Sequence, residues 1–180
     1  WCAIRDDDTL WCWGSDNDGA MGNGPDPASP TPVQVAGGGT WLHVSMGGVH
    51  GCGVQTDNTG WCWGWNHQGQ LGLGYFGGTV DSPTAVTGGH YWRIIEAGPN
   101  HSCGIRTDDT LWCWGDNEWG NLGDNTTTNR SEPVHVQPGT HWEDVSVGGR
   151  FTCGIRKSGT RYCWGLNDQS QLGNMNTPAA

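Results

Sequence analysis

Eight cysteines are the residues of this chain whose chemistry and spacing say most about it. They form four pairs with nine residues between the two members of each pair, and no Cys-x-x-Cys occurs, so a structural zinc site is not expected. None is left over, which favours four disulfides and an oxidising compartment over the alternative of eight buried thiols in the cytosol. The expected pairs are Cys2–Cys12, Cys52–Cys62, Cys103–Cys113 and Cys153–Cys163.

The register of a β-hairpin supports this pairing. Between Cys153 and Cys163, the segment Lys157-Ser158-Gly159 reads as a three-residue hairpin loop whose last residue must be left-handed. Counting outward from that loop places the two cysteines opposite each other at a non-hydrogen-bonded position, within disulfide reach. The residues equivalent to Gly159 are Asp8, Asn58 and Asp109, all of types that tolerate the left-handed conformation.

Other residues whose side chains could bind a metal or take part in catalysis are better explained by a structural role. Asp16-Asn17-Asp18-Gly19 resembles part of a calcium loop, but no Glu stands at its twelfth position, and Asp16 aligns with asparagines that we interpret as turn residues. His50 and His101 occupy equivalent positions that hold Phe151 in the last unit, which indicates packing. No nucleophile, base and orienting group recur together. We therefore expect no catalytic residue, no metal, no cofactor and no enzymatic activity.

The elements that must position these residues come from an internal repeat. The tetrad Trp-Cys-Trp-Gly, which begins with Tyr in its last copy, recurs at steps of 50, 51 and 50 residues. A tryptophan (Trp41, Trp92 or Trp142) stands eleven residues before the first cysteine of each of the last three units. A period near 50 residues with short apolar runs between turns predicts four antiparallel strands per unit, as in a propeller blade. Most tryptophans are then expected in the core.

The chain is predicted to be all-β, a single repeat array of about three and a half units of 50–51 residues over 1–180. The expected units are 1–40 (partial), 41–91, 92–141 and 142–180 (incomplete). Such an array is half of a seven-bladed propeller, or an open arc that is completed by self-association. We expect either a missing remainder or pairing between copies, because open sheet edges invite pairing.

The composition of the chain limits the classes of partner that it is expected to bind. Acidic residues outnumber basic ones 18 to 8, which gives a formal net charge of -10. This charge repels phosphate backbones and anionic lipid, so nucleic acid is not expected as a partner. No run of eighteen apolar residues occurs, so membrane insertion is not expected either. A protein partner remains open.

The segment from Cys103 to Gly123 resembles the repeats of the regulator of chromosome condensation family, and Gly64 to Gly72 reproduces the Gly-x-Asn-x-x-Gly-Gln-Leu-Gly motif of that family. The resemblance covers essentially the whole chain and implies a seven-bladed propeller of four-stranded blades. The family includes an exchange factor for a small GTPase, a plant photoreceptor and secreted members. The photoreceptor's Gly-Trp-Arg-His-Thr motif is absent here, and the disulfide-rich units fit the secreted members best.

Residues that depart from the repeat are the candidates for interaction. Trp65 and Trp119 replace polar or aliphatic residues of the other units, and Tyr75-Phe76 stands in a loop whose counterparts are polar. Exposed aromatics on loops commonly anchor interfaces. Possible N-glycosylation sites are Asn125, Asn129 and Asn100.

The sequence thus favours a secreted, non-enzymatic structural or interaction scaffold, extracellular or on the cell surface, that can assemble into a ring or filament. A secreted recognition protein, either an inhibitor or a lectin-like binder that uses loop aromatics, is the alternative. A GTPase exchange factor is a third class, and it would require free cysteines.

Overall fold

The computed structural model describes residues 1–16, 18–25 and 28–173, and these contain strands and turns but no helix. None of them therefore offers a helix that could cross a membrane. The strands are β1 (Cys2–Ile4), β2 (Leu10–Gly14), β3 (Ser29–Gln34), β4 (Trp41–Met46), β5 (His50–Gln55), β6 (Gly60–Trp65), β7 (Thr79–Ala85), β8 (Trp92–Ala97), β9 (His101–Arg106), β10 (Leu111–Gly115), β11 (Arg130–His135), β12 (Trp142–Val147), β13 (Phe151–Arg156) and β14 (Arg161–Gly165).

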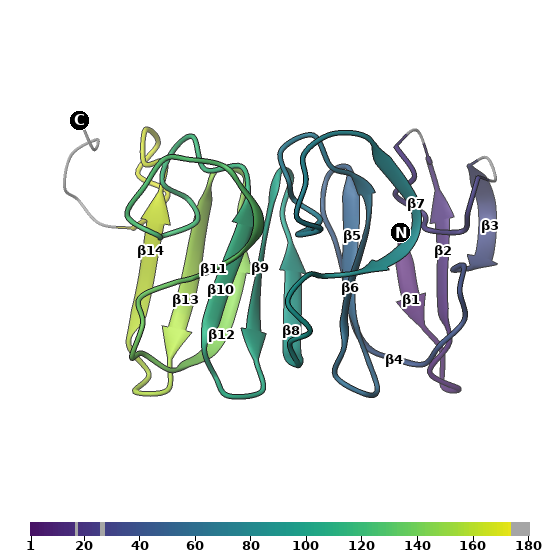
Figure 1. Ribbon diagram of the computed structural model, residues 1–180, viewed down its shortest axis with the longest axis horizontal. Coiled ribbons are helices and arrows are strands. Elements are labelled where there is room, and N and C mark those ends of the chain that lie inside the picture. Colours follow the sequence, from purple (N-terminus) through teal and green to yellow (C-terminus); the bar gives the residue numbers. More distant parts are fainter. Residues whose placement is uncertain (17, 26–27, 174–180) are drawn as a thin grey trace.

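These strands form four antiparallel sheets that stand side by side in chain order (Figure 1). The two middle sheets, β4 to β7 and β8 to β11, have four strands each. Among the described residues, the first sheet, β1 to β3, has no counterpart of β4, and the last sheet, β12 to β14, has no counterpart of β7. This is the all-β blade architecture that the repeat predicts.

The cysteine-bearing hairpin of each sheet has the predicted register. Asp8, Asn58, Asp109 and Gly159 all have positive φ, between 62° and 83°. In the second sheet this places Cys52 opposite Cys62, and the same pairing recurs in the other three. Disulfides join all four pairs at Cα–Cα distances of 4.0–4.1 Å, and no cysteine is free.

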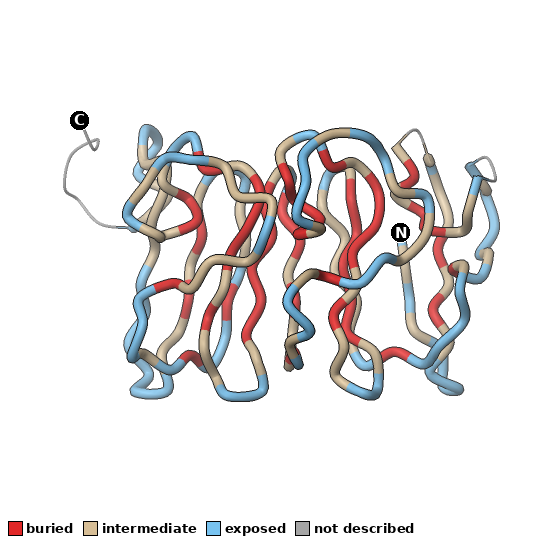
Figure 2. Tube along the Cα trace, in the orientation of Figure 1, coloured by how far each residue is buried: buried red, intermediate tan, exposed pale blue. Residues whose placement is uncertain are grey.

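The core lies between neighbouring sheets (Figure 2). Each sheet presents a disulfide face, which carries its cysteine pair, to the next sheet along the chain. That next sheet presents a tryptophan face, which carries the first tryptophan of its unit. Between the second and third sheets, Cys52 and Cys62 pack with Leu71 against Trp92 and Ile95, all of them 0% exposed. The same arrangement recurs at the other two junctions.

Three glycines are covered by a ring other than the one opposite them in the hairpin: Gly53 by Trp41, Gly104 by Trp92 and Gly154 by Trp142. In the third sheet, Trp112 is opposite Gly104, but the covering ring is that of Trp92 from the neighbouring strand. A β-bulge between Trp92 and Ile94 turns Trp92 toward this glycine. A Cβ on Gly104 would lie 2.7 Å from the Trp92 ring, so only glycine fits.

Asp16 has the turn role that its alignment predicts. Its carboxylate accepts a hydrogen bond from the Met21 N–H at 2.8 Å. Asn66, Asn117 and Asn167 accept the equivalent bond from the residue five positions on, at 3.0–3.1 Å. Burial raises the pKa of Asp16, with a further contribution from Asp81 and Asp18. The described residues contain no group of three or more side chains that could hold a metal ion.

Removing one disulfide should destabilise the protein measurably. Replacing Cys103 and Cys113 together with alanine should lower the free energy of unfolding by about 2–3 kcal/mol, since the bridge restricts the unfolded chain. Urea unfolding followed by circular dichroism measures this loss. A double variant whose midpoint matches the wild type would contradict a stabilising role.

Candidate functional site

The most regular feature of the three junctions between neighbouring sheets is a site on which an indole ring packs. Trp63, Trp114 and Trp164 each lie on a left-handed glycine of the preceding sheet. Each indole also donates a hydrogen bond to a carbonyl two residues before that glycine, at 2.9–3.0 Å. The glycines are Gly22, Gly72 and Gly123, and the carbonyls belong to Ala20, Gln70 and Asn121.

A second bond joins neighbouring sheets through histidine. His50 Nε2 lies 2.8 Å from Ser102 Oγ of the next sheet, and His101 Nε2 lies 2.9 Å from Thr152 Oγ1. The Ser102 hydroxyl donates its proton to the Gln70 carbonyl, so His50 must donate from Nε2. Both histidines are 0% exposed, as the packing interpretation predicts. Their Nδ1 atoms have no hydrogen-bond partner.

This environment keeps both imidazoles neutral. Burial lowers the pKa of His50 to about 3, with a smaller contribution from His101, and burial lowers the pKa of His101 to about 4. A proton added at Nδ1 would create a buried cation with an unsatisfied donor. Both histidines therefore join neighbouring sheets through hydrogen bonds made by the neutral imidazole.

Within the part of the chain that the structure describes, the first and last sheets each have one face without a neighbouring sheet. On the tryptophan face of the first sheet, Trp1 is 86% exposed, and the Trp13 indole N–H has no acceptor among the described residues. A recess of about 380 Å³ lies beside Trp13 and is lined by Ala3, Arg5, Trp11 and Pro32. On the disulfide face of the last sheet, Arg161 is exposed, and Cys153, Ile155 and Cys163 are half-buried.

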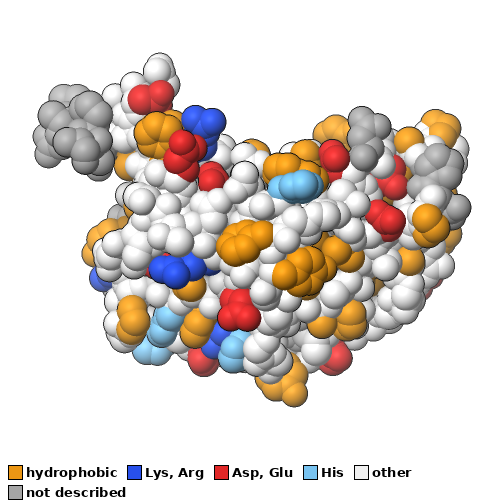
Figure 3. All heavy atoms as spheres, turned by 45° about the horizontal axis from the view of Figure 1, so that its top comes forward, with side chains coloured by type: hydrophobic (Ala, Val, Ile, Leu, Met, Phe, Trp, Pro, Cys, Tyr) orange, Lys and Arg blue, Asp and Glu red, His pale blue; other side chains and the backbone are white. Residues whose placement is uncertain are grey.

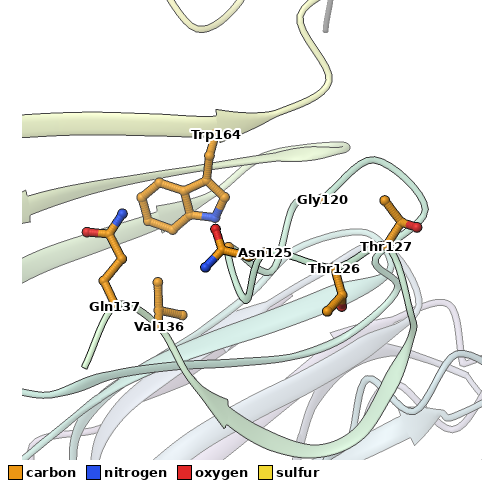
Figure 4. A pocket seen from close by; sticks show the side chains of 8 residues that line it. Gly120, Asn125, Thr126, Thr127, Val136, Gln137 and Trp164 are labelled. Atoms are coloured by element: carbon orange, nitrogen blue, oxygen red, sulfur yellow. The ribbon is translucent and has the colours of Figure 1, made fainter. Parts of the chain in front are cut away.

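A second recess, of about 490 Å³, lies beside the last sheet, for which the described residues include no fourth strand. Trp164 lies across it from Asn125, Val136 and Gln137 (Figure 4). At the preceding junctions the N–H of Gly24 or Gly74 donates to the outer strand of the next sheet at 2.8 Å. Asn125, the equivalent residue, has positive φ, but its N–H has no acceptor in the described part of the chain.

Three of the predicted interaction aromatics lie on loops that follow the second strand of a hairpin, whereas Trp65 is the last residue of β6. Tyr75, Phe76 and Trp119 are 49%, 54% and 42% exposed. Trp65 is half-buried and stacks on His67 with ring centroids 4.9 Å apart. Hydrophobic side chains form separate patches on the loop-bearing face, with histidine beside one of them (Figure 3). The structure does not join Trp65 and Trp119 into one pocket.

The three sequons differ in accessibility. Asn125 is exposed, and Asn100 is half-buried. The Asn129 side chain is engaged at both ends, because its carbonyl accepts the Asn117 N–H at 2.8 Å and its amide donates to Gln68 at 2.6 Å. A glycan on Asn129 would disrupt these bonds, so Asn125 is the sequon that the folded chain accommodates best.

One cluster of stacked aromatic and basic side chains was not predicted from the sequence. Arg106 stacks on the Trp112 ring at 3.4 Å, and His135 stacks on Trp112 with centroids 4.6 Å apart. Burial lowers the pKa of Arg106 to about 10. Burial also lowers the pKa of His135, with a contribution from Arg106. The partial signal was an arginine before the hairpin loop in three of four units, Arg5, Arg106 and Arg156.

Models of the "Regulator of chromosome condensation (RCC1) repeat" match most of the chain. One model matches residues 7–54, 57–105 and 108–155, and a second with the same description matches 92–120 and 142–171. No curated protein sequence matches the chain.

Solved structures share the fold. Yeast RCC1 (Prp20), determined bound to Kap60, superposes with a TM-score of 0.84 at 19% identity over 96% of this chain and 43% of that chain. Human WBSCR16 gives 0.81 at 20% identity over 92% and 44%. The ectodomain of the Physcomitrella patens receptor kinase CR4 gives 0.59 at 20% identity over 91% and 38%.

At these identities the structural likeness shows the fold alone, and the chain spans less than half the length of each of these structures. The repeat models cover well over half of the chain, and the four sheets match part of a seven-bladed propeller. The chain therefore belongs to the regulator of chromosome condensation (RCC1) repeat family and makes up part of an RCC1-type β-propeller.

Proposed function

We propose that this chain is an extracellular, non-enzymatic scaffold whose propeller sheets join to other copies and present loops to partners. The observation that carries the proposal is the junction that recurs between neighbouring sheets, in which a disulfide face packs against a tryptophan face. Because the units repeat, the same kind of contact can join the sheets of separate copies.

An extracellular location is supported by two observations. All eight cysteines are paired, and disulfides persist in oxidising compartments. The fold also resembles the ectodomain of a plant receptor kinase. A GTPase exchange factor that works in a reducing compartment fits the paired cysteines poorly.

The test is the size of the native, oxidised protein. We expect sedimentation and electron microscopy to show regular assemblies of 19.3 kDa units whose mass rises with protein concentration. A single species of 19.3 kDa at every concentration would overturn the self-joining scaffold.

A recognition protein is the second candidate, favoured by the exposure of Tyr75, Phe76 and Trp119. If the loops are the interface, replacing Trp65 and Trp119 with alanine should weaken association by tenfold or more, as removal of an aromatic anchor does. The fold should be kept, because neither ring is part of the core between sheets. Unchanged association in this double variant would rule out these two tryptophans as anchors of the interface.

A further inference from the structure

We propose that a groove along β11 binds an extended segment of another protein, one that carries a basic side chain next to an apolar side chain. This rests on the function proposed above, in which the array presents loops to partners, and it names the class of partner. The groove lies on the outer side of the junction between the second and third sheets, each of which has four strands, and β11 is the outer strand of the third sheet.

Two adjoining recesses form this β11 groove. One, of about 280 Å³, is lined by Phe76 and by residues 129–134, most of which belong to β11. The other, of about 170 Å³, has His90 in its wall. Glu132 and Pro133 line both recesses and therefore lie where the two meet. Five residues of one strand span roughly 16 Å, so the groove has the length of an extended peptide segment.

The groove brings together residues that depart from the repeat. Phe76 stands where the corresponding loop of the third sheet has Thr127. Glu132 stands where the other outer strands, β3 and β7, have Thr31 and Ser82. These two departures come from separate segments of the chain, and the fold places them on one surface. The packing that recurs between sheets does not require them, which favours a role in binding.

Glu132 supplies the charge of the groove. Its side chain is exposed and has no ion pair with another described residue. The neighbouring Arg130 is already neutralised, because a carboxylate oxygen of Asp124 lies 2.7 Å from its Nη2. The Asn129 side chain is engaged within the chain at both ends. A basic side chain of a partner therefore complements the groove, whereas an oligosaccharide would find few free polar groups.

The rest of the groove suits an apolar side chain rather than a paired strand. The Phe76 ring is 54% exposed and lines the larger recess together with Pro133 and Val134. Exposed rings of this kind anchor apolar side chains of partners. Pro133 has no N–H, and the Ser131 carbonyl already accepts a hydrogen bond from the Gly74 N–H at 2.8 Å. Strand addition along β11 is therefore interrupted, and recognition depends on side chains.

Panning a phage-displayed library of random heptapeptides on the oxidised protein tests the groove. The groove variant carries Phe76→Thr and Glu132→Thr, which install residues that other units have at these positions and so should keep the fold. The matched control carries Trp119→Thr and Glu118→Thr, which remove an exposed ring and an exposed carboxylate from the corresponding loop of the third sheet. Circular dichroism and non-reducing mass confirm that each variant is folded and oxidised.

We expect the wild type and the control to enrich peptides in which Lys or Arg stands near an aliphatic or aromatic residue. A fluorescein-labelled peptide with the enriched sequence should bind the groove variant at least tenfold more weakly, as measured by fluorescence polarisation. Its affinity for the wild type should fall with added salt, because it includes an ion pair with Glu132. Glu132→Thr alone should remove most of that salt dependence.

Four results would overturn the groove: no enrichment, enrichment of acidic or purely polar peptides, equal binding to the groove variant, or loss of binding in the control alone. A glycan array probed with the same proteins gives a fifth, since a glycan that only the groove variant fails to bind would replace the peptide as its ligand. Self-association is measured separately by sedimentation. A chain that assembles without binding peptide would therefore lose the groove and keep the scaffold function, and one that does neither would lose both.

Discussion

Replacing Trp92 with alanine should lower the free energy of unfolding by about 3–5 kcal/mol, the usual cost of deleting a large aromatic from a core. Trp92 is 0% exposed, covers Gly104, and packs with Ile95 against Gly60. Its loss would leave a cavity next to the Cys52–Cys62 bridge, in the cluster that joins the second and third sheets. Urea unfolding of the oxidised protein, followed by circular dichroism, measures the change.

Trp119→Ala is the matched control for that experiment. The Trp119 ring is 42% exposed, and the Arg150 guanidinium lies 5.7 Å from its centroid. Removing this ring should therefore lower the free energy of unfolding by less than about 1 kcal/mol. If both variants lost the same stability, the core assigned to the junction between the second and third sheets would be wrong.

Lowering the pH from 6.5 to 4 should remove on the order of 5 kcal/mol of stability through His50 and His101. The pKa of each is lower in the folded chain than the ordinary value of 6.5, so the unfolded chain binds more protons in this range. Stability is therefore complete above pH 6.5 and falls with decreasing pH by about 1.4 kcal/mol per unit for each histidine. The loss continues to about pH 4 for His101 and about pH 3 for His50.

A variant with both histidines replaced by phenylalanine isolates this effect. Phenylalanine occupies the equivalent position, Phe151, in the last unit, and Ser102 and Thr152 keep their bonds to carbonyl oxygens. Unfolding midpoints of the two proteins between pH 7 and 4 should diverge, with the wild type losing more. Parallel curves would show that the histidines do not govern the pH dependence, which also includes opposing contributions from Asp16 and Asp116, whose pKa values burial raises.

The parts of the fold that could be predicted are those set within one repeat. The loop residue at Asp8, Asn58, Asp109 or Gly159 needs positive φ, and that requirement alone determines the strand register and the cysteine pairs. The turn role of Asp16 followed from its alignment with asparagines. Each of these depends on residues less than about a dozen positions apart, where spacing and conformation are tightly linked.

Contacts between repeats could be predicted only in part. That Trp92 covers Gly104 depends on a bulge between Trp92 and Ile94, which the pattern of residue types does not reveal. The phenylalanine at position 151 indicated that His50 and His101 are packed, but their bonds to Ser102 and Thr152 required the relative position of two sheets. The sequence does contain a signal for these bonds, because Ser102 and Thr152 stand about one repeat after His50 and His101.

Every disulfide of this chain closes within one hairpin, and none links two sheets. A whole unit can therefore be duplicated or deleted without creating an unpaired thiol or requiring a new pairing. During oxidation each cysteine lies opposite its partner on the same hairpin. Additional units therefore add no wrong pairing that the hairpin register would favour. The length of such an array can change freely while its redox chemistry stays that of a single unit.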